Sequence, residues 1–319
     1  MRILSCVPLG ANVLPGHQVF TCGPREIADH VQEADVVVPG VNGIVDRAVL
    51  ERGGFGLVLQ AGVGIDTVDV EAATERGVWV AHVPGANAPS VAEHAVFLAL
   101  AVSRRLHEAE AALAARKVGQ PVGAGLQGKT ACIIGLGHVG SELARRLQVF
   151  DMTLVGVNPK HVQIDGVPLK ALHTPDQLSV AVADADYVFL CAAGESDTPL
   201  IDRQILSTMK RGAFFVNIAR GKLVDSSALL DALQSRQLAG AGLDVFADEP
   251  VDPAAPLLKQ LNVVATPHIA GDTDVSLAAI HAALRRDLEA YTRHERFPGL
   301  VNDPARPRFP LSRGHVRSV

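Results

Sequence analysis

Short apolar runs alternate with amphipathic segments along most of the chain. Runs rich in Val, Ile and Leu, which predict buried strands, occur at residues 34–40, 55–62, 77–85, 130–135, 152–157, 187–192, 213–219, 241–246 and 262–267. Segments with helical periodicity lie between many of them, at residues 46–53, 69–77, 141–150, 202–210 and 225–237. Apolar strands separated by helices are typical of parallel sheets that are covered on both faces. The pattern therefore predicts an α/β protein.

Two long helical segments, at residues 90–116 and 273–293, accompany the strand runs. A stretch rich in glycine, with one proline, follows the first of them at residues 117–129 and predicts a linker. The simplest architecture for this order is a pair of open parallel sheets joined by the two long helices.

Composition and charge narrow the class of protein. The 319 residues are 48% hydrophobic and 20% charged, which is enough apolar material for a sizeable core. The net charge of −5 argues against a nucleic-acid partner, because phosphate binding requires a concentrated basic surface. The longest apolar helical run, residues 95–102, is too short for a membrane span. The first residues contain too short an apolar run for a secretory signal peptide.

The four cysteines indicate a reducing compartment. Cys6, Cys22, Cys132 and Cys191 are far apart in the sequence and form no C-x-x-C pattern, so we expect no structural metal. Other histidines, such as His94 and His107, belong to no metal-ligand cluster and are interpreted as structural or solvated. We therefore expect a cytoplasmic protein without a metal site.

The segment "TACIIGLGHVGSELARRL" carries a glycine pattern directly after a predicted strand. Gly135, Gly137 and Gly140 have the spacing G-x-G-x-x-G and precede a helical segment. The first glycine permits a tight turn, the second lets a pyrophosphate approach the backbone, and the third allows close packing of helix on strand. The N–H groups at the start of the helix then bind the phosphates. This context predicts a dinucleotide cofactor.

The end of the next strand leaves the choice between NAD and NADP open. An acidic residue that binds the ribose hydroxyls is expected there, whereas this chain has Asn158. An asparagine can bond a 2′-hydroxyl, but it does not repel a 2′-phosphate as a carboxylate does. Lys160 or His161 can pair with such a phosphate.

Polar side chains also follow later strands of the same set. Arg220 follows the run 213–219, Asp244 lies in the run 241–246 with Glu249 just beyond it, and His268 follows the run 262–267. Each alone has an ordinary structural interpretation, as a surface cation, a cap or a turn residue. Because the carboxyl ends of parallel strands meet at one edge of a sheet, we expect the four to gather beside the dinucleotide.

Several segments resemble, in the same order, the motifs of the D-isomer-specific 2-hydroxyacid dehydrogenase family, which includes phosphoglycerate dehydrogenases and glyoxylate/hydroxypyruvate reductases. These segments are "PGANAPSVAEHAV", "GLQGKTACIIGLGHVG", "NIARGKLVD", "GLDVFADEP" and "TPHIAGDT". The resemblance extends from about residue 35 to about residue 305. It implies a homodimer and a Rossmann dinucleotide-binding domain, residues 98–286, inserted into a flavodoxin-like substrate-binding domain formed by residues 1–97 and 287–319.

The resemblance also implies roles for particular residues. His268 is the proton-transfer group, Glu249 is its partner, and Arg220 binds the carboxylate and carbonyl oxygen of the substrate. The backbone N–H groups of Val63 and Gly64 bind the other carboxylate oxygen, and Asp244 bonds the nicotinamide carboxamide. The further residues expected at the cofactor are Val91, Gly135, Gly137, His138, Val139, Gly140, Asn158, Ala192, Ile218, Ala219, Ala270 and Gly271.

The chain departs from the family pattern in two places, a loop after one strand and a single residue beside the glycine pattern. Cys191, Ala192 and Ala193 stand where the family usually has a histidine, a small residue and a proline, so the loop over the cofactor is expected to differ in shape. His138 stands where an arginine is frequent beside the pyrophosphate.

The expected reaction is hydride transfer between NAD or NADP and a small-molecule D-2-hydroxy acid or 2-oxo acid of the glyoxylate, hydroxypyruvate or 3-phosphoglycerate type. An NAD(H)-sensing protein of the corepressor type and a dehydrogenase of the same fold acting on phosphite remain alternatives. Formate is disfavoured, because formate dehydrogenases carry glutamine at the position of Glu249. Residues 6–12 and 39–45 contain no Lys or Arg, which favours the small 2-oxo acids over a phosphorylated substrate.

His138 leads to a prediction about cofactor binding. A histidine is positively charged only when it is protonated, so its attraction for a pyrophosphate weakens as pH rises. We expect the dissociation constant of the cofactor, measured by fluorescence titration, to increase between mildly acidic and mildly alkaline pH. A constant that barely changes over this range would contradict the interpretation.

Overall fold

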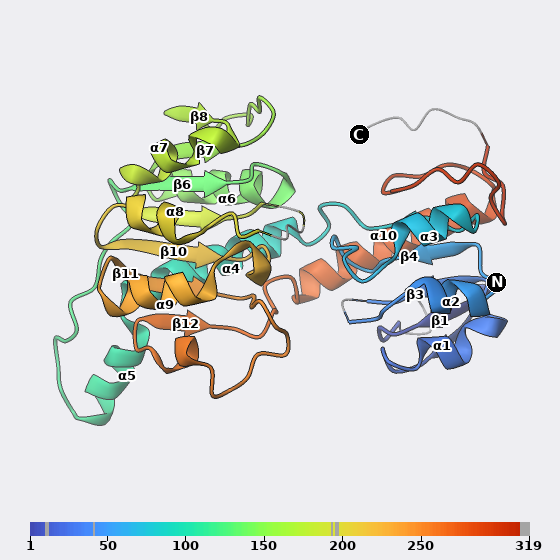
Figure 1. The fold of residues 1–319 in the computed structure, drawn as a ribbon, viewed down its shortest axis with the longest axis horizontal. Helices are drawn as coiled ribbons and strands as arrows, with labels where there is room; N and C mark the ends of the chain where they lie inside the picture. Colours follow the sequence, from blue (N-terminus) through green and yellow to red (C-terminus); the bar gives the residue numbers. More distant parts are fainter. Residues whose placement is uncertain (10–12, 41, 193, 195–197, 313–319) are drawn as a thin grey trace. The chain divides into compact units, whose positions relative to one another are not determined.

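A computed structural model of the chain describes residues 1–9, 13–40, 42–192, 194 and 198–312 (Figure 1). The chain forms two compact units, Met1–Asn87 with Asp274–Val319 (unit 1) and Ala88–Thr273 (unit 2). Each unit contains one parallel sheet, which confirms the predicted α/β class. The boundaries expected from the sequence, 97/98 and 286/287, fall inside two continuous helices, α4 (Ala88–Ser103) and α10 (Asp274–Thr292).

Unit 1 is built on a five-stranded sheet in the order β2-β1-β3-β4-β5. Its strands are β1 (Arg2–Ser5), β2 (Gln18–Thr21), β3 (Val36–Val38), β4 (Leu57–Leu59) and β5 (Trp79–Ala81). Its α-helices are α1 (Ile27–His30), α2 (Arg47–Arg52), α3 (Val70–Glu75) and α10. Successive strand residues face opposite sides of a sheet, so Leu57 packs in one cluster with Leu288 of α10, whereas Val58 packs in another with Leu50 of α2.

Unit 2 is built on a seven-stranded sheet in the order β12-β11-β10-β9-β6-β7-β8. Its strands are β6 (Thr130–Ile134), β7 (Thr153–Val157), β8 (Ala171–His173), β9 (Tyr187–Leu190), β10 (Ala213–Asn217), β11 (Leu238–Leu243) and β12 (Val263–Ala265). Its α-helices are α4, α5 (Leu106–Ala114), α6 (His138–Val149), α7 (Leu178–Ala183), α8 (Arg203–Thr208) and α9 (Ser226–Gln234). Ile133 packs with residues of α4 and α6, and the adjacent Cys132 packs with residues of α7, α8 and α9, so helices cover both faces.

The first long helix expected from the sequence, 90–116, is in fact two helices. α4 ends at Ser103, whose carbonyl accepts a hydrogen bond of 2.8 Å from the N–H of Ala124 in the linker. Arg105, just before α5, has a φ of +56°. The linker thus satisfies a carbonyl that a continuous helix would use itself. No helix in the described parts of the chain is long and apolar enough to cross a membrane.

Two cysteines that are distant in the sequence lie close together in the fold. Cys6 and Cys22 follow β1 and β2, two strands that pair in parallel, and their Sγ atoms are 3.7 Å apart. Both are free thiols, as are Cys132 and Cys191. Burial is the main cause that raises the pKa of Cys6 to about 12.

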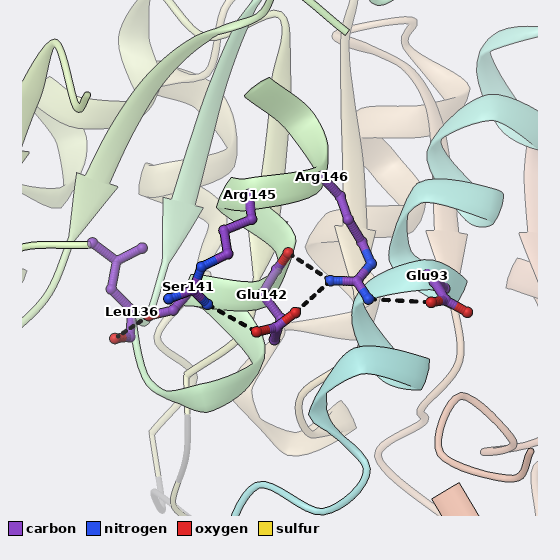
Figure 2. Close-up of polar contacts among 6 residues, drawn as sticks. All are labelled: Glu93, Leu136, Ser141, Glu142, Arg145 and Arg146. Atoms are coloured by element: carbon purple, nitrogen blue, oxygen red, sulfur yellow. Dashed lines mark hydrogen bonds and ion pairs between the residues drawn. The ribbon is translucent and has the colours of Figure 1, made fainter. Parts of the chain in front are cut away.

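The turn between β6 and α6 is packed too tightly for side chains at two of its glycines. Gly135 has a φ of +93°, and a Cβ at this residue would lie 2.7 Å from the backbone N of Ala192. A Cβ at Gly140 would lie 1.9 Å from the carbonyl oxygen of Gly135. The side chain of Ser141 donates to the carbonyl of Leu136 at 3.3 Å, which closes the turn from the helix side (Figure 2).

Helix α6 is fixed to α4 by a cation that bridges two carboxylates. Arg146 bonds Glu142 one turn earlier on α6 at 2.6 Å and Glu93 on α4 at 3.1 Å (Figure 2). Burial of the side chain opposes these carboxylates, which nevertheless raise the pKa of Arg146 above its usual value. Helix α6 is therefore held at Arg146 by the ion pair with α4 and near its N-terminus by the hydrogen bond of Ser141 to the turn.

The packing at Gly140 predicts a marked loss of stability in Gly140→Ala. The new methyl group must displace the backbone of the turn, and such overpacking costs about 1–3 kcal/mol. We expect the free energy of unfolding in urea to fall by about 2–3 kcal/mol. Gly137→Ala is the matched control, because a Cβ there meets nothing within 4 Å. Equal losses in the two variants would show that the close approach is not the cause.

Candidate functional site

The polar residues and glycines predicted for the site follow the carboxyl ends of parallel strands in the sheet of unit 2. Strand order reverses at β6, whose neighbours are β9 and β7, and ligands of open α/β sheets bind beyond the carboxyl ends at such a point. Gly135 follows β6, Ala192 lies two residues beyond β9, and Arg220 lies three beyond β10. Asp244 follows β11 and His268 lies three residues beyond β12.

His268 and Glu249 are directly paired. His268 Nδ1 and Glu249 Oε2 are 2.7 Å apart, and the two side chains are 34% and 33% exposed. The other oxygen of Glu249 accepts a hydrogen bond of 2.9 Å from the N–H of Phe246, which fixes the carboxylate. The pairing engages Nδ1 and leaves Nε2 as the other ring nitrogen. A carboxylate at one ring nitrogen fixes the orientation of an imidazole, and an imidazole oriented in this way is able to transfer a proton.

The backbone at His268 is held in an unusual conformation by Asp244. His268 has a φ of +57°, in the left-handed region that residues with side chains rarely adopt. The backbone carbonyl of Asp244 accepts the N–H of His268 at 2.8 Å. Its buried carboxylate accepts the N–H groups of Ile269 and Ala270, each at 3.0 Å. One residue thus anchors the turn that presents the imidazole.

Arg220 is positioned by its own strand end and by a close backbone contact. Asn217 Nδ2 donates to the Arg220 carbonyl at 3.1 Å, and the guanidinium donates to the carbonyl of Ala219 at 2.8 Å. A Cβ at the next residue, Gly221, would lie 1.8 Å from the carbonyl carbon of Phe246. The segment bearing Arg220 is therefore packed against the segment that leads to Glu249.

The glycine turn fits a dinucleotide. Gly137 lies at the N-cap of α6 with open space around its Cα, and the exposed His138 is the first residue of the helix. Backbone N–H groups at a helix start bind phosphates, and the helix dipole favours the negative charge. Val139 is half-buried behind them.

Asn158 is engaged within the turn itself. Its Oδ1 accepts the N–H of Leu136 at 3.1 Å, and its Nδ2 donates to the carbonyl of Lys160 at 2.9 Å. The side chain thereby fixes the glycine turn while standing at the end of β7, where an acidic residue was expected. An asparagine performs this bridging because it both accepts and donates.

The remaining predicted cofactor residues in unit 2 are mainly apolar residues that belong to the hydrophobic core. Val91, Ile218 and Ala270 belong to one buried cluster, and Ala219 belongs to the cluster on the other face of the sheet. Gly271 is half-buried after Ala270. Ala193, in the loop expected to differ from the family, lies outside the described residues.

The predicted substrate loop lies in unit 1, after β4. The carbonyl of Val63 is 3.0 Å from Nδ1 of His82. Within the described parts of the chain, the backbone hydrogen bonds of turns and loops include none donated by the N–H groups of Val63 and Gly64. Backbone N–H groups that are not engaged in this way can bind a carboxylate oxygen.

Sequence reasoning missed a histidine that contacts the site. His94 lies on α4, and its Nε2 is 2.8 Å from Oγ1 of Thr266. Thr266 in turn donates to Asp244 at 2.6 Å. The available signal was a polar residue inside the apolar run of the first long helix.

No cluster of three or more potential metal ligands occurs among the described residues.

Comparisons with known proteins reveal relatives of this chain. The profile of the D-isomer specific 2-hydroxyacid dehydrogenase NAD binding domain matches residues 96–270. The D-3-phosphoglycerate dehydrogenase of Methanocaldococcus jannaschii is 33% identical over 293 residues, which are 91% of this chain and 56% of that protein. The glyoxylate reductase of Korarchaeum cryptofilum is 34% identical over 293 residues, 87% of this chain and 86% of that protein. The chain spans about half the length of several phosphoglycerate dehydrogenases it matches, 56%, 48% and 46% for three of them.

Solved structures show the same architecture over nearly the whole chain. A protein from Thermus thermophilus superposes with a TM-score of 0.85 at 32% identity, covering 95% of this chain and 100% of that one. An NADPH-dependent glyoxylate/hydroxypyruvate reductase from Sinorhizobium meliloti superposes with a TM-score of 0.83 at 26% identity, covering 98% and 99%. With the profile match over most of unit 2 and these relatives, the chain belongs to the D-isomer specific 2-hydroxyacid dehydrogenase family.

Proposed function

We propose that this chain catalyses the transfer of a hydride between a nicotinamide dinucleotide and the C2 atom of a small D-2-hydroxy acid or its 2-oxo acid. The observation that carries the proposal is the pair formed by His268 and Glu249, 2.7 Å apart, on the sheet edge that also bears the glycine turn. The family supplies enzymes of this reaction type as relatives, among them a glyoxylate reductase.

The proposed chemistry assigns one task to each polar residue. The bound nicotinamide dinucleotide supplies or accepts the hydride. In the direction of reduction, His268 Nε2 donates a proton to the carbonyl oxygen of the 2-oxo acid as C2 receives the hydride and the carbonyl becomes a hydroxyl group. Glu249 holds the ring in place through its contact with Nδ1. In the opposite direction the neutral imidazole takes the hydroxyl proton.

We propose that Arg220 orients the substrate through its carboxylate and carbonyl oxygen, since a planar guanidinium binds two oxygens at once. The N–H groups of Val63 and Gly64 are proposed to bind the second carboxylate oxygen. Segments 6–12 and 39–45 of unit 1 contain no Lys or Arg, which supports a small, unphosphorylated 2-oxo acid such as glyoxylate or hydroxypyruvate.

The cofactor preference is proposed to depend on Asn158. Its amide carries no charge that repels a 2′-phosphate, and Lys160, two residues later, is exposed and can pair with one. The acidic residue that usually excludes NADPH is replaced here by Asn158, so this position does not discriminate against NADPH.

The free thiols support a reducing, cytoplasmic compartment for this reaction.

We further propose that the chain acts as a homodimer that buries the segment from α5 to the linker, residues 106–125. No residue of α5 is buried, and in Figure 1 this segment lies apart from the sheet of unit 2. Leu113, Val118 and Val122 are 77%, 94% and 84% exposed. Apolar side chains gathered on one exposed segment favour contact with a protein surface, and a second copy of the chain is the proposed occupant.

The enzymatic proposal is tested by following oxidation of NADH and of NADPH with glyoxylate, hydroxypyruvate, pyruvate and phosphohydroxypyruvate. We expect turnover with at least one unphosphorylated 2-oxo acid. His268→Ala is expected to lower kcat by about 10²–10⁴-fold, the usual contribution of a positioned acid. The ratio of kcat/KM for the two cofactors measures the effect of Asn158.

His30→Ala is the matched control, because His30 is an exposed histidine on α1 of unit 1. It is expected to retain the kcat of the unmodified chain. Cofactor binding without turnover of any of the four acids would contradict the proposed reaction. Turnover that survives in His268→Ala would contradict the assigned proton-transfer group.

The dimer is tested by light scattering during gel filtration. The unmodified chain is expected to elute with about twice its mass of 33.5 kDa. Replacing Leu113 and Val118 by Asp should shift the population to the single mass, because charges would be buried in the contact. Val180→Asp, at an apolar residue of α7 that is 65% exposed, is the control and should leave the mass unchanged. A single mass for the unmodified chain would refute the proposal.

A further inference from the structure

Helix α4 contacts the His268 segment, residues 266–273, near both of its ends. His94 Nε2 lies 2.8 Å from Oγ1 of Thr266, the first residue of the segment. Ser90 Oγ lies 2.7 Å from Oγ1 of Thr273, the last residue. Ser90 and His94 are four residues apart and so lie on the same face of the helix. The segment that carries the proposed proton-transfer group is therefore bonded at its two ends to one rigid element.

The hydrogen bonds at Thr266 determine which atom of His94 carries a proton. Oδ1 of Asp244 accepts the N–H of Ile269 and Oδ2 accepts the N–H of Ala270, so the carboxylate acts as an acceptor. Thr266 has a single hydroxyl proton and donates it to Oδ1 at 2.6 Å. Thr266 must then accept from His94, which requires a proton on Nε2.

The surroundings of His94 support a neutral ring with this proton. Burial is the larger influence and lowers the pKa of His94, while the charge of Asp244 opposes it. The ring also packs beside Phe97, with centroids 5.4 Å apart. A partly buried, neutral imidazole with one N–H is a directional donor, and its direction here is toward Thr266.

We propose that His94 is a positioning residue of the proposed reaction: it acts through Thr266 and Asp244 to hold the left-handed turn at His268. The inference rests on the proposed function. The chain of contacts runs from His94 to the Thr266 hydroxyl, then to the Asp244 carboxylate, and then to the N–H groups of Ile269 and Ala270 that follow His268. Ser90 secures the other end of the same segment at Thr273.

The effect of His94 is expected in kcat. Loss of the donor loosens the turn that presents Nε2 of His268, so proton transfer becomes slower. The glycine turn is unchanged, so binding of the cofactor is not affected. A single hydrogen bond contributes about 0.5–1.5 kcal/mol, which corresponds to about 2- to 12-fold in rate. His94→Phe keeps the ring and removes the donor, whereas His94→Gln offers an N–H at a similar distance from the backbone.

Two measurements test the proposal, with His94→Phe and His94→Gln compared throughout. In steady-state assays His94→Phe is expected to lower kcat by about 2- to 12-fold with an unchanged dissociation constant for the cofactor, and His94→Gln to restore most of the loss. In hydrogen exchange, the N–H groups of Ile269 and Ala270 are expected to exchange faster in His94→Phe and at nearly the original rate in His94→Gln. This second measurement does not require activity.

The outcomes separate the two proposals. If no 2-oxo acid is turned over but exchange at Ile269 and Ala270 responds to His94, the proposed function fails and the positioning contact stands. If exchange and kcat are both unchanged in His94→Phe, the positioning role is overturned. Should His94→Phe fail to fold, Thr266→Val and Thr266→Ser provide the same comparison, since only serine keeps the hydroxyl. Equal behaviour of these two variants would also overturn it.

Discussion

The site depends on one buried carboxylate that stabilises a strained turn. Asp244 receives the N–H of His268 on its backbone carbonyl and the next two N–H groups on its side chain. A residue with a side chain at a φ of +57° persists only where its surroundings fix it several times over. Consecutive N–H groups that converge on an anion form such a fixed nest. Asp244 thus supplies the acceptors for three consecutive N–H groups of the turn that carries the imidazole paired with Glu249.

A second constraint operates where β6 and β9 lie side by side. The turn at Gly135 fits against Ala192 because neither the turn nor the strand end carries a bulky group there. Asn158 then joins the same turn to the end of β7. The proposed phosphate-binding and proton-transfer groups are thereby carried by neighbouring strand ends, and their spacing follows from the register of the sheet.

Most of the residues that follow the carboxyl ends of the strands of unit 2 could be predicted from sequence. A strand end is marked by a glycine or a charged residue directly after an apolar run. The strand pattern predicted that His268 and Glu249, nineteen residues apart, share one edge of the sheet, and the two side chains are in direct contact there. The rest required tertiary contacts. The end of α4 at Ser103 depends on an N–H of the distant linker, and His94 looked structural because Thr266 and Asp244 approach it only in the folded sheet. Local pattern carries no information on such contacts.

The division of the chain into two units has an evolutionary consequence. The residues that fix the imidazole all belong to unit 2, from Ser90 on α4 to Thr273, whereas the loop with Val63 and Gly64 belongs to unit 1. Substitutions at residues without shared partners act nearly additively. Under the proposed function, substitutions in the loop of unit 1 can change which acid is bound, while the contacts that fix the imidazole in unit 2 are inherited intact. Such a division lets the range of substrates change without a new proton-transfer geometry.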